Sequence, residues 1–99
     1  MSLTVKDQLV ILEYNKRMKI ALSAEDDKVC FLVATDIIQA LLGSNLNQNL
    51  IMAIIDSDLF LKLSERKNRL ITDLPGDTLK KITKKDMREY YSLSKRMEQ

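Results

Sequence analysis

The stretch KVCFLVATDIIQALLG, residues 28–43, sets a run rich in branched side chains directly before a run of good helix formers. Residues 28–33 are apolar after the first lysine, which favours a buried strand. Thr35 and Asp36 then offer an N-cap residue followed by a carboxylate suited to the positive end of a helix. Gly43 can end that helix in the left-handed conformation. The stretch therefore predicts a strand that turns at a capped corner into a helix.

The residues before this corner predict two further strands. Residues 8–14, QLVILEY, form a short apolar run rich in branched side chains. Asn15 tolerates the left-handed conformation of a hairpin turn. Residues 17–23, RMKIALS, alternate between apolar and other side chains with a period of two, as a half-exposed strand does. The three strands together predict an antiparallel meander.

The residues after the corner predict a hairpin and two helices. Residues 50–55, LIMAII, favour a short helix with Asn47 or Asn49 as its cap. Residues 60–63 and 69–72 are predicted to pair as a hairpin around the charged turn SERKN. In the last segment Thr83 and Asp86 have the spacing of a capping box. The helix that follows is expected to turn one stripe inward, formed by Met87, Tyr90, Tyr91, Ser94 and Met97.

These elements predict an α+β fold, with a meander and a later hairpin packed against two or three helices. The 99 residues suffice for one domain, spanning 1–99, and 45% of them are apolar while 30% are charged. Cys30 is the single cysteine, so no internal disulfide can form, and its apolar surroundings predict a buried thiol. No run is apolar enough to predict a membrane span. A cytoplasmic protein is expected.

The residue types argue against an enzyme. The chain has no histidine, which removes the usual general base at neutral pH. Two isolated glycines cannot build a Walker loop or a dinucleotide fingerprint. Asp56 and Asp58 could hold a hard cation with a hydrolytic role, but solvated loop carboxylates explain them better. The sequence therefore predicts no catalytic residue, no cofactor and no metal site.

Charge is distributed unevenly along the chain. Residues 1–61 carry a net charge of −3 and residues 62–99 carry +5, within a total of +2. A basic segment of this kind is compatible with a polyanionic partner.

The residues 13–45, EYNKRMKIALSAEDDKVCFLVATDIIQALLGSN, resemble the start of the BRO N-terminal domain family of prophage antirepressors and baculovirus repeated-gene proteins. Phe31, Asp36, Ala40 and Leu41 fall near the family's strand-to-helix positions. The residues 78–96, TLKKITKKDMREYYSLSKR, are similar to the family's closing strand and helix. The resemblance implies a single BRO-N-like domain with a non-enzymatic role in DNA binding or in modulating transcription.

On that hypothesis the basic residues of the second half contact the phosphates of double-stranded DNA. The predicted contacts are Lys62, Arg66, Lys67, Arg69, Lys80, Lys81, Lys84, Lys85 and Arg88. Taken singly, each of these side chains is better explained as part of a solvated surface, and their clustering narrows that margin without reversing it. The alternative hypothesis is a protein-interaction module that binds a repressor protein or pairs with itself without DNA. Its support is the apolar content of residues 29–60 and the five methionines, which leave room for an exposed apolar patch.

Overall fold

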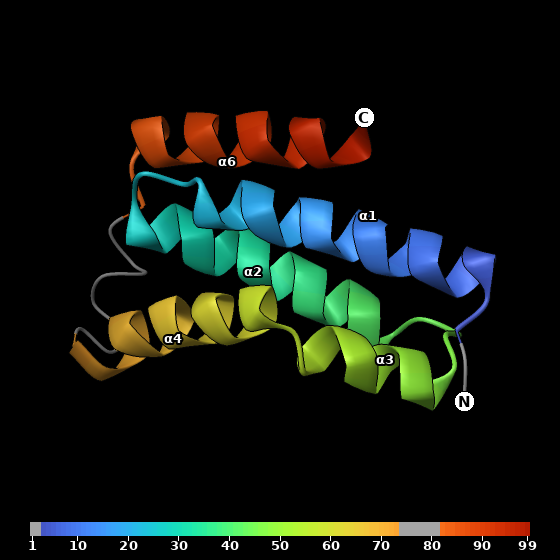
Figure 1. Cartoon of the computed structure of the whole chain (residues 1–99). Coiled ribbons are helices and arrows are strands. Elements are labelled where there is room, and N and C mark those ends of the chain that lie inside the picture. The colour runs from blue at the N-terminus through green and yellow to red at the C-terminus, as the bar shows by residue number, and fades with distance from the viewer. Residues whose placement is uncertain (1–2, 74–81) are drawn as a thin grey trace.

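The structure, a computed structural model, describes residues 3–73 and 82–99. The chain is helical over almost all of these residues (Figure 1). The helices are α1 (Val5–Leu22), α2 (Asp27–Leu42), α3 (Gln48–Ile55), α4 (Asp58–Asp73) and α6 (Lys84–Glu98). No strand occurs among the described residues. The predicted α+β fold is therefore wrong, and the described fold is all-α.

Helix α1 replaces the first two predicted strands. It begins with a capping box, in which the side chains of Thr4 and Asp7 each accept a hydrogen bond from the other's backbone N–H. Tyr14, Met18 and Ala21 recur at steps of four and three and are all buried. This helical spacing supplies the core contacts of the segment. The strands predicted over 8–14 and 17–23 are therefore wrong. Asn15 lies inside the helix and not in a turn.

Helix α2 replaces the predicted strand-to-helix corner. Its N-cap is Asp26, whose carboxylate accepts from the Lys28 N–H at 2.8 Å. The predicted cap Thr35 lies in the middle of the helix, where its hydroxyl donates to the carbonyl oxygen of Phe31 at 2.8 Å. The strand predicted over 28–33 is therefore wrong. The helix does end at Gly43, but that residue has a φ of −87° and is not left-handed.

Helices α3 and α4 cover the segments predicted as a short helix and a hairpin. The short helix over 50–55 is confirmed, with Asn47 as its cap through a 2.8 Å bond from the Asn49 N–H. The hairpin predicted over 60–63 and 69–72 is wrong, because α4 runs through both segments without a break. Ser57 joins the two helices, since its hydroxyl donates to the last turn of α3 and accepts from the first turn of α4.

The C-terminal helix is confirmed with its cap. Thr83 and Asp86 form the predicted capping box, with bonds of 2.9 and 3.1 Å between side chains and backbone. Leu93 is buried, whereas Tyr91 is 63% exposed. The inward position predicted for Tyr91 is therefore wrong.

Helices α1 and α2 form a central antiparallel pair with α4 and α6 on opposite sides of it (Figure 1). Both outer helices contact both central helices. The largest fully buried side chains are Met18, Leu41, Ile54, Leu63, Val29, Val33 and Cys30. The prediction that the Cys30 thiol is buried is thus confirmed, and burial raises its pKa. In the described part of the chain no helix combines the length and apolar character needed to cross a membrane.

Candidate functional site: a basic face on helix α6

The seven predicted phosphate-binding residues that the structure describes lie on two helices. Lys62, Arg66, Lys67 and Arg69 belong to α4, and Lys84, Lys85 and Arg88 belong to α6. Lys80 and Lys81 lie outside the described residues. Because α4 and α6 lie on opposite sides of the central pair, their basic residues form two separate groups (Figure 1).

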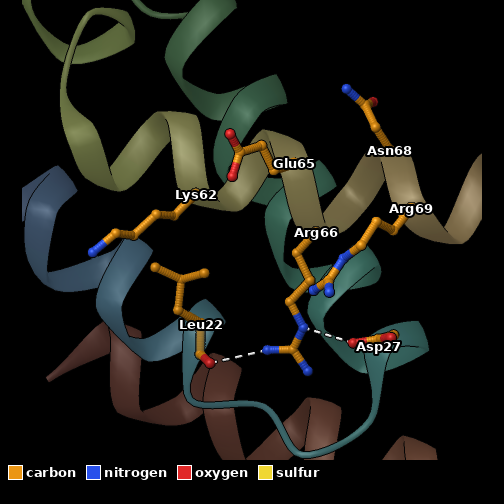
Figure 2. A pocket seen from close by; sticks show the side chains of 7 residues that line it. All are labelled: Leu22, Asp27, Lys62, Glu65, Arg66, Asn68 and Arg69. Atoms are coloured by element: carbon orange, nitrogen blue, oxygen red, sulfur yellow. Dashed lines mark hydrogen bonds and ion pairs between the residues drawn. The ribbon is translucent and has the colours of Figure 1, made fainter.

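Arg66 of α4 is engaged inside the fold. Its guanidinium donates to the Asp27 carboxylate at 2.7 Å and to the backbone carbonyl oxygens of Leu22 and Ala24 at 2.9 and 2.6 Å. Figure 2 shows the side chain directed from α4 toward the end of α1 and the start of α2. Only 14% of this side chain is exposed. Arg66 therefore ties three helices together and is unavailable to a phosphate.

The other basic residues of α4 are poorly placed for a polyanion. The Lys67 ammonium lies 5.8 Å from the centre of the Phe31 ring, within cation–π range. Lys62 and Arg69 are exposed, but they share a surface groove with the carboxylates of Asp27 and Glu65 (Figure 2). The mixed charge of this groove weakens any attraction for phosphate.

Helix α6 carries the more uniform surface. Its outward residues recur at the spacing of one helical face, are all exposed, and together form what we term the basic face, composed of Lys84, Lys85, Arg88, Tyr91, Ser92, Lys95 and Arg96. Five of the seven are cations. No ion pair within the described residues involves any of the five. The face therefore presents its positive charge to solvent.

Two of the three acidic residues of α6 are turned toward the α1–α2 loop and the start of α2. Asp86 is buried, and its carboxylate lies 2.8 Å from the Lys28 ammonium. Glu89 accepts a bond from the backbone N–H of Asp26 at 3.3 Å. Glu98 is exposed at the end of the helix. The fold thus sorts most of the opposite charge away from the basic face.

The Lys28 ammonium holds the pKa of the Asp86 carboxyl well below its usual range, and the backbone N–H of Thr83 lowers this pKa by a smaller amount. The native pKa of Asp86 is below the unfolded value, so the stabilisation is complete above about pH 5 and is lost as the pH falls toward the native pKa. We expect Asp86→Asn to lower the thermal midpoint at pH 7, with the difference from wild type shrinking as the pH falls to 3.

The matched control is Asp7→Asn, which alters the same capping-box position in α1, where the box is exposed. This variant is expected to cause a smaller fall in the thermal midpoint at pH 7. Thermal melts between pH 2 and pH 8 measure both effects. Equal losses for the two variants would contradict a special role of the Lys28–Asp86 pair.

A groove beside the C-terminal end of α6 extends the positive surface onto α1. Its charged lining residues are Lys16 and Lys19 from α1 and Arg96 from α6, and no carboxylate side chain lines it. The Lys16 ammonium donates to the carbonyl oxygen of Gln99 at 2.5 Å. The groove therefore joins two basic segments that are far apart in the sequence.

Sequence reasoning missed four members of this surface, Lys16, Lys19, Lys95 and Arg96. The first two fall in a predicted turn and a predicted strand, and the last two are absent from the predicted phosphate contacts. The spacing of Lys84, Arg88 and Lys95 on one helical face was a usable signal for the α6 residues. No local signal could bring Lys16 and Lys19 to them, because that proximity depends on the packing of α1 against α6.

No group of three or more potential metal ligands occurs among the residues that the structure describes. Asp56 and Asp58 are exposed around the junction of α3 and α4. The basic face can attract and position anions, which is a binding capability.

Comparison with protein-family models, curated proteins and solved structures found no match for this chain. The resemblance to the BRO N-terminal domain stays a prediction. The strand-to-helix corner on which it depended is a continuous helix in this structure.

Proposed function

We propose that this domain binds double-stranded DNA without enzymatic action, through the basic face of α6 and the adjoining groove on α1. The observation that carries the proposal is the gathering of five exposed cations on one side of a single helix. Phosphate contacts supply most of the affinity of non-specific DNA binding. The proposal therefore needs no base-reading residue.

The dimensions of the face suit a phosphate backbone. Lys84 and Lys95 are eleven residues apart, which corresponds to about 16 Å along the helix at 1.5 Å per residue. A duplex carries one negative charge per about 1.7 Å of its axis, so several phosphates lie within this span. Lysine and arginine side chains at successive turns can contact them together.

The composition of the face favours nucleic acid over a lipid surface. A helix that lies on a membrane buries large apolar side chains beneath its charged ones. Tyr91 is the one large aromatic or aliphatic residue of the basic face. The apolar residues Leu93 and Met97 of the same helix pack against or within the protein core.

Binding to duplex DNA is expected to depend steeply on salt. If all five cations of the face contact phosphates, the log–log slope is about −4.5, and affinity falls about 500-fold between 50 and 200 mM salt. Fluorescence anisotropy with a labelled duplex of unrelated sequence measures the slope. A slope near zero would contradict the proposal.

Two double variants of equal charge change locate the site. Arg88→Gln with Lys95→Gln removes two cations from the basic face and is expected to flatten the slope by about 2. Lys62→Gln with Arg69→Gln removes two exposed cations from α4 and is expected to change it much less. Equal changes would assign binding to net charge alone. Binding to anionic vesicles without binding to DNA would contradict the proposal, because it would show that the partner is a lipid surface.

The proposed biological setting is the modulation of transcription in a virus or prophage. This setting rests on the resemblance to the BRO N-terminal domain family alone. A cytoplasmic location is part of the same proposed setting. The alternative, a protein-interaction module, has its support in a row of exposed apolar side chains on α1, one of which, Leu12, also lines the groove described above.

A further inference from the structure

The first half of α1 carries a row of exposed apolar side chains. Val5 is 73% exposed, and Leu9 and Leu12 are each 61% exposed. Their spacing of four and three residues places them on one side of the helix. Figure 1 shows that α1 extends beyond the C-terminal end of α6 at this point, so α6 does not cover the row.

This row is separate from the core-facing side of the same helix. Tyr14 and Met18 are buried, and they lie about half a turn away from the line through Leu9 and Leu12. The helix therefore has two apolar sides, of which the fold uses one. An apolar row with this spacing matches the seam along which two helices pack in a coiled coil.

Opposite charges flank the row in a way that suits a second copy of the same chain. Lys6 and Glu13 are seven residues apart and therefore lie on the same edge of the row. If two α1 helices pack antiparallel, with Leu9 of each against Leu12 of the other, this register sets Lys6 of each copy beside Glu13 of the other. The arrangement is two-fold symmetric and contains two such pairs.

Both flanking side chains are accessible for this contact. Lys6 is exposed. The Glu13 side chain is 43% exposed, and its carboxylate lies 3.3 Å from Arg17 Nε within the same helix. The second carboxylate oxygen of Glu13 can accept from a partner without breaking that bond.

We propose that two copies of this chain associate through an antiparallel pairing of their α1 helices. Three apolar side chains per copy make a small interface, well under the roughly 800 Å² per partner of a stable complex. The association is therefore weak and reversible. It goes beyond the proposed DNA binding and does not depend on it.

The decisive experiment is a charge exchange followed by sedimentation equilibrium, in the absence of nucleic acid. Lys6→Glu alone sets two carboxylates against each other in both pairs, and Glu13→Lys alone sets two ammonium groups against each other. Each variant is therefore expected to associate roughly tenfold more weakly than wild type. In an equimolar mixture the two variants can also form a mixed dimer, which contains one chain of each kind.

 Every register of the mixed dimer sets opposite charges together, because one chain carries only carboxylates at positions 6 and 13 and the other carries only ammonium groups there. Both pairs of the mixed dimer are therefore attractive, and its association constant is expected to return to within about threefold of wild type. Circular dichroism verifies that each variant is folded.

A second pair of variants tests the apolar row. Leu9→Glu is expected to abolish association, whereas Leu61→Glu is expected to leave it unchanged, because Leu61 is 57% exposed but lies on α4. A wild-type chain that stays monomeric at 1 mM overturns the proposal. So does association that survives Leu9→Glu, or a mixture of charge variants no stronger than either alone. None of these outcomes bears on the salt dependence of DNA binding.

Discussion

Leu63→Ala is expected to lower the free energy of unfolding by about 2–5 kcal/mol, the range for a leucine removed from a packed core. Leu63 is 1% exposed and belongs to α4, which packs against both central helices. A loss of this size is a large share of the roughly 5–15 kcal/mol that stabilises a domain. Urea unfolding followed by circular dichroism at 222 nm measures it.

Leu61→Ala is the matched control, and it also distinguishes the helix from the hairpin predicted for this segment. Two residues apart on a strand, Leu61 and Leu63 would share one face and become equally buried. On a helix the same two residues lie about 200° apart. Leu61 is 57% exposed, so we expect its replacement to change stability by no more than about 0.5 kcal/mol. Losses of similar size would contradict the helical assignment of α4.

Arg66→Met is expected to lower the free energy of unfolding by about 2–4 kcal/mol, because charge-assisted hydrogen bonds contribute about 1.5–3 kcal/mol each. The change keeps the apolar stem and removes the guanidinium that bonds Asp27 and the carbonyl oxygens of Leu22 and Ala24. Those carbonyls then depend on water for their partners. The loss is less than the sum of three bonds because water replaces part of them.

Lys62→Met controls for the loss of one positive charge on the same helix. Lys62 is exposed, and its replacement is expected to change stability by about 0.5 kcal/mol or less. Arg66→Lys is expected to fall between the two, because an ammonium cannot reproduce the planar fork that reaches three acceptors. Chemical denaturation of the three variants in one buffer gives the order. An Arg66→Met protein as stable as wild type would show that the three contacts are dispensable.

Local signals predicted the ends of helices better than their extent. The capping box at Thr83 and Asp86, the cap at Asn47 and the end of a helix at Gly43 are confirmed. Each depends on a few neighbouring residues, because a side chain satisfies backbone groups two or three positions away. The equivalent box at Thr4 and Asp7 is present in the sequence and was overlooked.

The strand predictions failed for a common reason. Valine, isoleucine and threonine favour strands by a margin that tertiary packing readily overrides. In α2 the residues Val29, Val33, Ile37 and Leu41 recur at four-residue steps and are all buried. In α1 the two-residue alternation of 18–22 coexists with a helical spacing of Tyr14, Met18 and Ala21. The length over which the helical period persists was the better guide.

The candidate site was predicted in part. Reading cations along the sequence counted Arg66 and Lys67 among the phosphate contacts, but packing directs these two side chains to Asp27 and Phe31. It also adds Lys16 and Lys19, whose helix meets α6 through long-range contacts. Whether a cation is available to a ligand depends on its neighbours in space, and these are not neighbours in sequence.

By itself the amino-acid order determined where several helices start and stop, that Cys30 is buried, and that the second half carries the positive charge. Helix caps depend on neighbouring residues, and charge and apolar content follow from counting residues, so none of these needs the tertiary structure. Only the tertiary structure decided that the first half is helical and that α4 and α6 lie apart. It also decided which cations and which apolar row of α1 stay exposed. The physical reason is that burial and ion pairing depend on distances set by the packing of all the helices together.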